Sequence, residues 1–157
     1  MTDMLVKLYS LPALEPVLAQ QKAAGVEIRR AMAAEKQIVA DWVARNFEPG
    51  WVSESEVAFA RQPIACFIAV ENGQLVGFAC YDTTCKNFFG PTGISNPQRG
   101  RGVGKALLLA CLHAMGGQGY AYAIIGGVGP VEFYAKTVGA VVIEGSEPGI
   151  YGHMLTP

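Results

Sequence analysis

The sequence has few groups that could hold a metal ion or build a disulfide framework. It contains two histidines and four cysteines among 157 residues. The cysteines form no C-x-x-C pair and show no Cys/His ligand spacing; they are Cys66, Cys80, Cys85 and Cys111. We therefore expect no bound metal, and we expect reduced, mostly buried thiols in a cytoplasmic protein.

Charged residues and long apolar runs are also scarce. Only 16% of the residues are charged and the net charge is −1, whereas a nucleic-acid binder is usually basic overall. No uninterrupted apolar run reaches the roughly 18 residues that a membrane span needs. The N-terminus also lacks the basic and apolar segments of a signal peptide. We therefore expect no nucleic acid and no membrane among its partners. With 51% hydrophobic residues, the sequence can build one compact domain over residues 1–157.

Acidic residues are absent between Asp82 and Glu132. The intervening residues 83–131 carry a net charge of +4, against −3 for residues 1–82 and −2 for residues 132–157. Eleven of the 19 glycines fall between positions 90 and 129. A basic, glycine-rich middle in a weakly acidic chain indicates a small anionic ligand.

Hydrophobic periodicity and turn residues predict a mixed α/β domain around one sheet. Asn72-Gly73 between two apolar segments predicts a hairpin. Pro49-Gly50, Gly116-Gly117 and Gly139 mark expected helix ends. Strands are expected near residues 6–8, 26–30, 64–70, 75–81, 88–95, 120–125, 141–144 and 151–155. Helices are expected over residues 14–24, 35–47, 53–61, 102–115 and 130–138.

The segment 96–105, Asn-Pro-Gln-Arg-Gly-Arg-Gly-Val-Gly-Lys, joins an expected strand to an expected helix. Alternate glycines let backbone N–H groups converge at a helix N-terminus, where the helix dipole favours anions. The segment is not a Walker A motif, because Arg99 and Ala106 replace its first glycine and its Ser/Thr. It is not a dinucleotide fingerprint either, because Lys105 replaces the third glycine. The remaining interpretations are a pyrophosphate site and a plain glycine turn with solvated arginines.

The pattern Arg99-x-x-Gly102-x-Gly104 resembles the acetyl-CoA loop of the GCN5-related N-acetyltransferase (GNAT) superfamily. The resemblance extends from Ile94 to Leu107, and the order of elements is similar from about residue 26 to residue 155. It implies a GNAT-like fold: a central, mostly antiparallel sheet that splays between its fourth and fifth core strands, with helices on both faces. Residues 1–25 lie outside the resemblance and would form an N-terminal strand–helix extension.

The same resemblance implies acetyl-CoA as co-substrate. The backbone of the strand before the loop would pair with the pantetheine arm, through Gly93, Ile94 and Ser95. The loop itself would hold the pyrophosphate through its amides and cationic side chains, from Arg99, Gly100, Arg101, Gly102, Val103, Gly104 and Lys105.

A second motif, Pro130-x-x-Phe133-Tyr134, resembles the family motif whose tyrosine protonates the departing thiolate. It implies that Tyr134 is the general acid, and a phenol with a pKa of about 10 is protonated at neutral pH. A core tyrosine on an amphipathic helix is the other interpretation. Gly127 and Pro130 depart from the family motif, which has asparagine and alanine at these positions.

The general base and the acceptor site are less evident from the sequence. Many relatives use a glutamate on the fourth core strand, but residues 87–95 contain no acid. Asp82 is the nearest carboxylate in sequence and our first choice, with Glu54, Glu56 and Glu132 as the others. Water chains to backbone carbonyls are a further route. Aromatic side chains that could line an acceptor pocket are Trp51, Phe88, Phe89 and Tyr151.

Together these features predict an N-acetyltransferase. It would transfer acetyl from acetyl-CoA to a primary amine by direct attack in a ternary complex. The acceptor would be a small molecule, an amino acid or a peptide N-terminus. The alternative is a non-catalytic GNAT-like module that binds acyl-CoA, and a further one is a regulatory domain that binds another nucleotide. A homodimer is compatible with the sequence, which indicates no interface.

Overall fold

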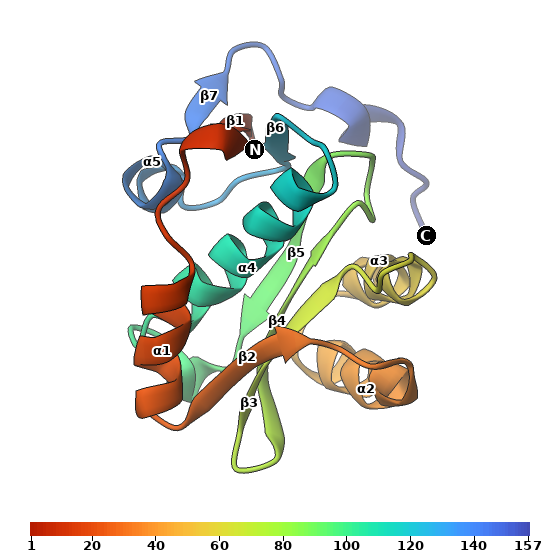
Figure 1. The fold of residues 1–157 in the computed structure, drawn as a ribbon. Helices are drawn as coiled ribbons and strands as arrows, with labels where there is room; N and C mark the ends of the chain where they lie inside the picture. Colours follow the sequence, from red (N-terminus) through yellow and green to blue (C-terminus); the bar gives the residue numbers. More distant parts are fainter.

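The computed structural model describes residues 1–157, which fold around a single seven-stranded sheet with the strand order β2-β3-β4-β5-β6-β1-β7 (Figure 1). Every neighbouring pair is antiparallel except β5 and β6. The strands are β1 Asp3–Lys7, β2 Val26–Arg30, β3 Cys66–Glu71, β4 Gln74–Tyr81, β5 Phe88–Ile94, β6 Tyr122–Ile125 and β7 Val141–Ile143. This arrangement confirms the mixed, mostly antiparallel sheet expected from the sequence.

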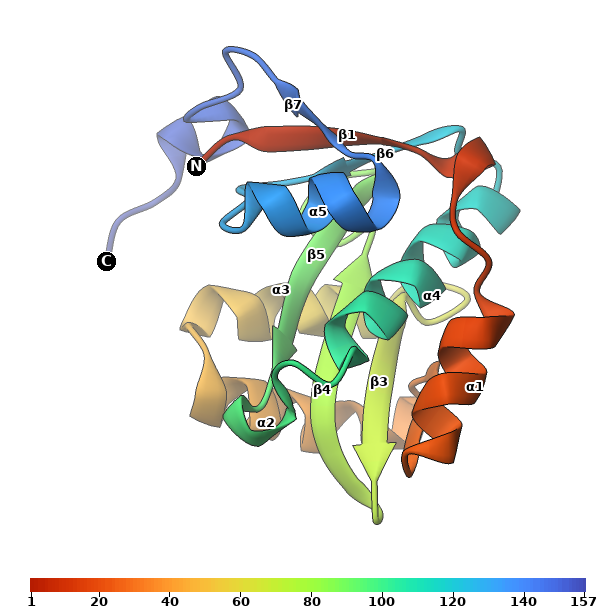
Figure 2. The same cartoon turned by 90° about the vertical axis from the view of Figure 1, so that its left-hand side faces the viewer.

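Helices cover both faces of the sheet, as Figures 1 and 2 show. One face carries α1 (Glu15–Ala23), α4 (Val103–Gly117) and α5 (Val131–Val138). The opposite face carries α2 (Lys36–Asn46) and α3 (Pro49–Phe59). None of these helices is both long and apolar enough to cross a membrane.

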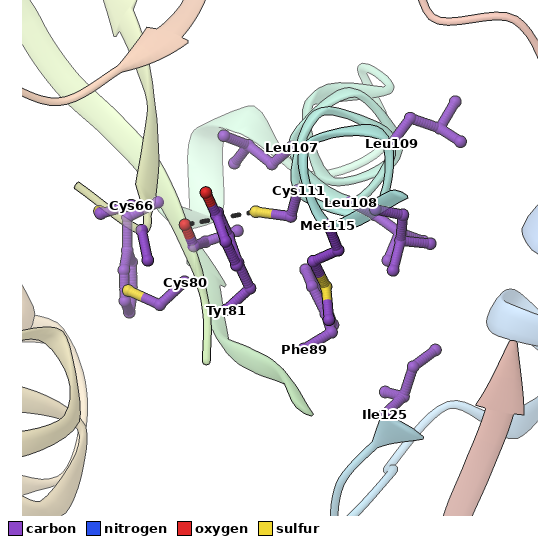
Figure 3. Packing of buried hydrophobic residues seen from close by; sticks show 14 of the residues in the cluster. Cys66, Cys80, Tyr81, Phe89, Leu107, Leu108, Leu109, Cys111, Met115 and Ile125 are labelled. Carbon is purple, nitrogen blue, oxygen red and sulfur yellow. Dashed lines mark hydrogen bonds between the residues drawn. The ribbon is translucent and has the colours of Figure 1, made fainter. Parts of the chain in front are cut away.

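Side chains of α4 pack against the sheet in the hydrophobic core (Figure 3). Leu107, Leu108 and Leu109 are all buried, so α4 is covered on most of its circumference. The Cys111 thiol lies against the Ala79 carbonyl oxygen, with an Sγ–O distance of 3.5 Å. Burial raises the pKa of the Cys111 and Cys80 thiols well above the usual value, so both are protonated and unreactive at neutral pH.

Most of the expected elements are confirmed to within a few residues, including the hairpin whose turn is Asn72-Gly73. One helix begins earlier than predicted. Pro49-Gly50 was expected only to separate two helices. Pro49 is instead the first residue of α3, and Glu48 is its N-cap. Proline suits that position because its missing N–H would have no helical partner there.

The predicted strand over residues 151–155 is wrong. The chain instead forms a short 3-10 helix, Gly149–His153. The N-terminal strand β1 explains the difference, because it lies between β6 and β7 and pairs with both. The place between β6 and β7 is therefore taken by β1, and residues 151–155 pair with no strand.

The sheet splays between β5 and β6, as the family resemblance implies. The two strands pair only at Phe88 with Ile124 and at Phe89 with Ile125. Beyond that point β5 continues to Ile94, whereas β6 ends at Ile125. The edge of β5 beyond Phe89 therefore lacks a neighbouring strand.

Candidate active site

The glycine loop leads directly from β5 into α4. Gly100 and Gly102 both have a φ of +81°, a left-handed conformation that side chains disfavour. Left-handed residues alternating with ordinary ones make successive N–H groups converge into a concave anion site. Space is also restricted here, because a Cβ on Gly104 would lie 2.8 Å from Ile94 Cδ1. The glycines are therefore required by backbone conformation and by close packing.

Several amides of this loop have no acceptor within the protein. The Gln98, Arg99 and Arg101 N–H groups bond to nearby carbonyls. The amides without a bond are those of Gly100, Gly102, Val103, Gly104 and Lys105. The last three belong to the first turn of α4, where the helix dipole adds partial positive charge. The loop is thus a cradle of free donors for an anion.

The cations of the loop differ in their availability. Arg99 and Lys105 are exposed and form no ion pair. Arg101 instead pairs with Glu71 on the β3–β4 hairpin, with Nη2 3.1 Å from Oε1, and it also bonds to Gln98. Hydrogen bonds from Arg101 and then Gln98 lower the pKa of the Glu71 carboxyl. The structure therefore assigns Arg101 to the support of the loop, and not to the set of free cations predicted from the sequence.

The strand before the loop offers peptide groups at its open edge. The Ser95 N–H donates to the Val76 carbonyl on β4 at 3.0 Å. Peptide groups alternate in direction along an antiparallel strand, so those of Ile94 and Thr92 point away from β4. Gly93 and Ser95, by the same alternation, bond toward β4. Of the three predicted residues, Ile94 is the one that presents donors and acceptors to the splay.

A cavity of about 540 Å³ occupies the splay. One wall is the open edge of β5 and the other is the loop after β6, and α3, α5 and the C-terminal segment complete it. The residues that line it are Met1, Trp51, Glu54, Thr84, Phe89, Gly90, Pro91, Thr92, Ile125, Gly126, Gly127, Val128, Gly129, Pro130, Tyr134, Glu147, Pro148 and Tyr151. The predicted residues Tyr134, Trp51 and Tyr151 therefore meet in one place although they are distant in sequence.

Tyr134 reaches the cavity from α5. Its ring lies edge-on to Phe89, with centroids 6.4 Å apart. The side chain is only 7% exposed, and this burial raises its pKa to about 12. A buried phenol that keeps its proton throughout the physiological range can serve as a proton donor.

Tyr151 closes the cavity from the C-terminal 3-10 helix. Its hydroxyl rests on Gly126, where a Cβ would lie only 2.4 Å away, so the loop needs glycine at this position. Burial first, then the charges of Asp3, Glu54 and Cys85, raises the pKa of Tyr151 to about 12. The Asp3 carboxylate also accepts the Gly127 N–H at 2.8 Å, which fixes the position where the family motif has asparagine.

Glu54 is the free carboxylate of the cavity. It lies one turn after Trp51 on α3, and its Oε1 accepts a hydrogen bond from the Thr84 hydroxyl at 2.5 Å. No cation pairs with it. The other acidic side chain that lines the cavity, Glu147, forms an ion pair with the Met1 amino group. The sequence placed Glu54 only among the secondary choices, because nothing local shows that α3 turns this residue toward the splay.

Asp82, the first choice for the general base, does not lie in this cavity. Its carboxylate accepts the Asn87 N–H at 2.7 Å and the Tyr120 hydroxyl at 3.0 Å. Its φ of +56° places it in the turn between β4 and β5, beside a separate cavity of about 430 Å³. Asp82 therefore stabilises a turn, and its nearness in sequence to β5 was misleading.

Phe88 also lies outside the cavity lining. Its ring packs against Gly126, where a Cβ would lie 2.9 Å from Phe88 Cδ2. The neighbouring Phe89 lines the cavity instead. Successive residues of a strand point to opposite faces, so the cavity receives one of the two rings and not both.

Comparison with known proteins agrees with the GNAT-like fold described above. A family model described as the Acetyltransferase (GNAT) family matches residues 36–140. No curated protein is significantly similar to the chain. A solved GCN5-related N-acetyltransferase from Sphaerobacter thermophilus aligns with a TM-score of 0.69 at 22% identity, over 90% of this chain and 48% of that one.

Two further solved structures are similar. The first is a GCN5-related glucosamine N-acetyltransferase region of a fungal multi-domain GH3 β-N-acetylglucosaminidase. It aligns with a TM-score of 0.73 at 15% identity, over 90% of this chain and 19% of that one. The second is a GCN5-related N-acetyltransferase from Kribbella flavida. It aligns with a TM-score of 0.56 at 16% identity, over 90% of this chain and 53% of that one. The chain spans about half or less of the length of these proteins.

Proposed function

Since the chain belongs to the acetyltransferase (GNAT) family, we propose that it transfers acetyl from acetyl-CoA to a primary amine by direct attack in a ternary complex. The observation that carries the proposal is one continuous path. Free amides at the start of α4 lead along the open edge of β5 to a cavity that contains a protonated tyrosine and a free carboxylate.

The residues along this path fit the parts of acetyl-CoA. The free amides from Gly100 to Lys105 would hold the pyrophosphate, with Arg99 and Lys105 contributing charge. The outward peptide groups of Ile94 and Thr92 would pair with the amides of the pantetheine arm, as an added strand does. Acetyl-CoA carries the acetyl group as a thioester, and the thioester itself makes the acetyl group reactive toward an amine.

Tyr134 and Glu54 supply the two proton positions that acetyl transfer needs. An ammonium with a pKa of about 8 to 10 must lose a proton before its nitrogen can attack, and the departing thiolate must gain one. The Tyr134 hydroxyl holds a proton at the cavity wall and is the proposed donor. Glu54 is the proposed acceptor, in place of Asp82, because it lies in the same cavity.

Release of free thiol from acetyl-CoA, measured over a panel of primary amines, tests the proposal. We expect amine-dependent thiol release at neutral pH together with formation of the acetylated amine. Binding of acetyl-CoA without turnover on any amine would reject catalysis and favour the non-catalytic acyl-CoA-binding alternative.

A pair of arginine variants tests the placement of the cofactor. Arg99→Ala should weaken CoA binding and reduce its dependence on salt, because a free cation next to the phosphates is lost. Arg101→Ala should weaken CoA binding less and leave its salt dependence nearly unchanged, because its guanidinium is already paired with Glu71. Equal effects of the two variants on CoA affinity would contradict this assignment.

A further inference from the structure

We infer that the acceptor is a primary amine without a carboxylate, bound with its ammonium group against Glu54 and its apolar body against the aromatic side chains of the cavity. The inference rests on the proposed function, which leaves small amines, amino acids and peptide N-termini open. The choice among these acceptor classes is based on the charges and the side-chain surfaces that line the cavity.

Glu54 is the only charged side chain of the cavity lining that forms no ion pair. The charged side chains that line the cavity are Glu54 and Glu147, and the charge of Glu147 is already balanced by the Met1 amino group. A carboxylate on the ligand would share a partly enclosed cavity with Glu54, where the two charges repel each other more strongly than in water. An ammonium group instead gains a charge-assisted hydrogen bond.

Glu54 is held in place to receive such a group. The Thr84 hydroxyl occupies Oε1, which leaves Oε2 without a partner. Its charge also acts on Tyr151, since it is one of the causes that raise the pKa of that phenol, after burial and Asp3. Glu54 and Tyr151 both line the cavity.

Aromatic side chains line the same cavity as Glu54. Trp51 lies one turn before Glu54 on α3 and is fixed by stacking on Phe47, with ring centroids 4.8 Å apart. Phe89, Tyr134 and Tyr151 complete the aromatic lining. Such a surface binds an apolar or aromatic body by burial, and ring faces also attract the adjoining ammonium.

An acceptor with a carboxylate next to its amine fits this cavity less well. An α-amino acid brings its carboxylate within two bonds of the amine, so the ammonium cannot reach Glu54 without bringing the carboxylate along. The cavity offers such a carboxylate no cationic side chain. The free cations Arg99 and Lys105 lie at the start of α4, in the proposed phosphate site.

Matched ligand pairs test the inference by binding, independently of turnover. Tyramine and tyrosine differ by one carboxylate, as do tryptamine and tryptophan. Dissociation constants are measured by calorimetry with the full chain, with and without saturating CoA. We expect each amine to bind at least about 10-fold more tightly than its amino acid. In Glu54→Gln the ratio should fall toward 1, whereas Glu56→Gln, an exposed carboxylate on the same helix, should leave it unchanged.

The outcomes separate the inference from the proposed function. Amino acids that bind as tightly as the amines would overturn the inference, as would a ratio that Glu54→Gln does not change. Binding of CoA without binding of either ligand class would also overturn it and leave the proposed function standing. Failure of CoA itself to bind would reject the proposed function, and the amine preference measured without CoA would still decide the inference.

Discussion

Two of the side chains that line the cavity are tyrosines with raised pKa values. Tyr134 lies on α5 and Tyr151 on the C-terminal 3-10 helix, and burial is the main cause of the high pKa of each. Both therefore stay neutral when an amine acceptor begins to lose its proton. In the proposed mechanism the two proton positions are separate, because Tyr134 keeps its proton and the Glu54 side chain is the proposed acceptor.

Replacement of Tyr134 by phenylalanine should lower turnover about 100-fold and leave the affinity for CoA nearly unchanged, since a general acid typically contributes 10²- to 10⁴-fold. The matched control is Tyr122→Phe, which removes an exposed hydroxyl that contacts only Tyr9. Steady-state thiol release and calorimetry provide the two measurements. Equal turnover of wild type and Tyr134→Phe would remove Tyr134 from the role of proton donor.

The pH profile offers a second check on Tyr134. A donor whose pKa is raised to about 12 is fully protonated below that value, so its own ionisation lowers the rate only as pH approaches 12. We expect the rate to rise as the amine deprotonates, with a pKa of about 8 to 10, and to show no decline below about pH 10. A decline that begins near pH 8 and disappears in Tyr134→Phe would contradict the pKa that burial produces.

Helix α1 is the element that supports the glycine loop from outside the matched family region. Gln21 is buried and donates from Nε2 to the Arg101 carbonyl oxygen at 2.8 Å. Its amide also lies 3.0 Å from the position of a Cβ on Gly102. This role was not predictable from the sequence, because the contact joins residues 80 positions apart.

Gln21→Ala should therefore weaken CoA binding without removing any group that touches CoA. Loss of one hydrogen bond of about 0.5–1.5 kcal/mol corresponds to a roughly 2- to 10-fold increase in Kd. Gln20→Ala changes an exposed residue of the same helix and should have no effect. Calorimetry with CoA compares the two variants, and identical dissociation constants would show that α1 does not position the loop.

A second contact between elements fastens β2 to the start of α2. Arg29 bonds both oxygens of Glu35, at 2.6 and 2.9 Å. The hydrogen bond from Arg29 outweighs the opposing effect of burial, and with the Met32 N–H and the charge of Arg29 it lowers the pKa of Glu35 from 4.5 to about 2. The folded state thus binds this proton more weakly than the unfolded chain does.

Because the folded pKa is the lower one, the stabilisation is fully present above pH 4.5 and is lost as pH falls toward 2. Glu35→Gln should lower the free energy of unfolding at pH 7 by about 1 kcal/mol, after allowance for solvent screening. The difference from wild type should vanish near pH 2. Glu27→Gln, which alters an exposed carboxylate beside Arg29, is the control for denaturant titrations at several pH values. A difference that persists at pH 2 would exclude the ion pair as its cause.

The individual elements were largely predictable from the sequence, because turn residues and apolar periodicity act locally. Asn72-Gly73 fixed the hairpin, and the glycines from 100 to 104 marked the loop before α4. The site was predictable only in part. The +4 charge of residues 83–131 overstated the free cations, because Arg101 pairs with Glu71 and Lys86 lies at the second cavity beside Asp82. Such pairings depend on distant parts of the chain and leave no local pattern.

The molecule as a whole depends on β1, which brings the two ends of the chain together. Besides pairing with β6 and β7, β1 and the residue before it hold the C-terminal segment. The Asp3 N–H donates to the Ser146 hydroxyl at 2.8 Å, and the Thr2 and Ser146 hydroxyls lie 2.9 Å apart. These contacts anchor the segment that places Tyr151 over Gly126. The placement of β1 was not predictable, because neither its composition nor the family motifs indicate which strands it joins.

Val6→Ala should therefore destabilise the entire fold. Val6 on β1 is fully buried, and we expect a loss of about 2 kcal/mol in the free energy of unfolding. For a chain of this size that corresponds to a decrease in Tm of roughly 4–8 °C. Val141→Ala, on the exposed edge strand β7, is the control and should change Tm little. Equal effects in thermal unfolding would mean that β1 does not contribute to the core as the sheet order requires.

The central claim is that the loop before α4 and the open edge of β5 bind acetyl-CoA. Calorimetric titration of the full chain with acetyl-CoA, CoA and ATP tests it most directly. We predict that acetyl-CoA and CoA each bind at one site, more tightly than ATP, and that Arg99→Ala weakens both. Absence of binding for both CoA species, or affinities that Arg99→Ala and added salt leave unchanged, would contradict the claim.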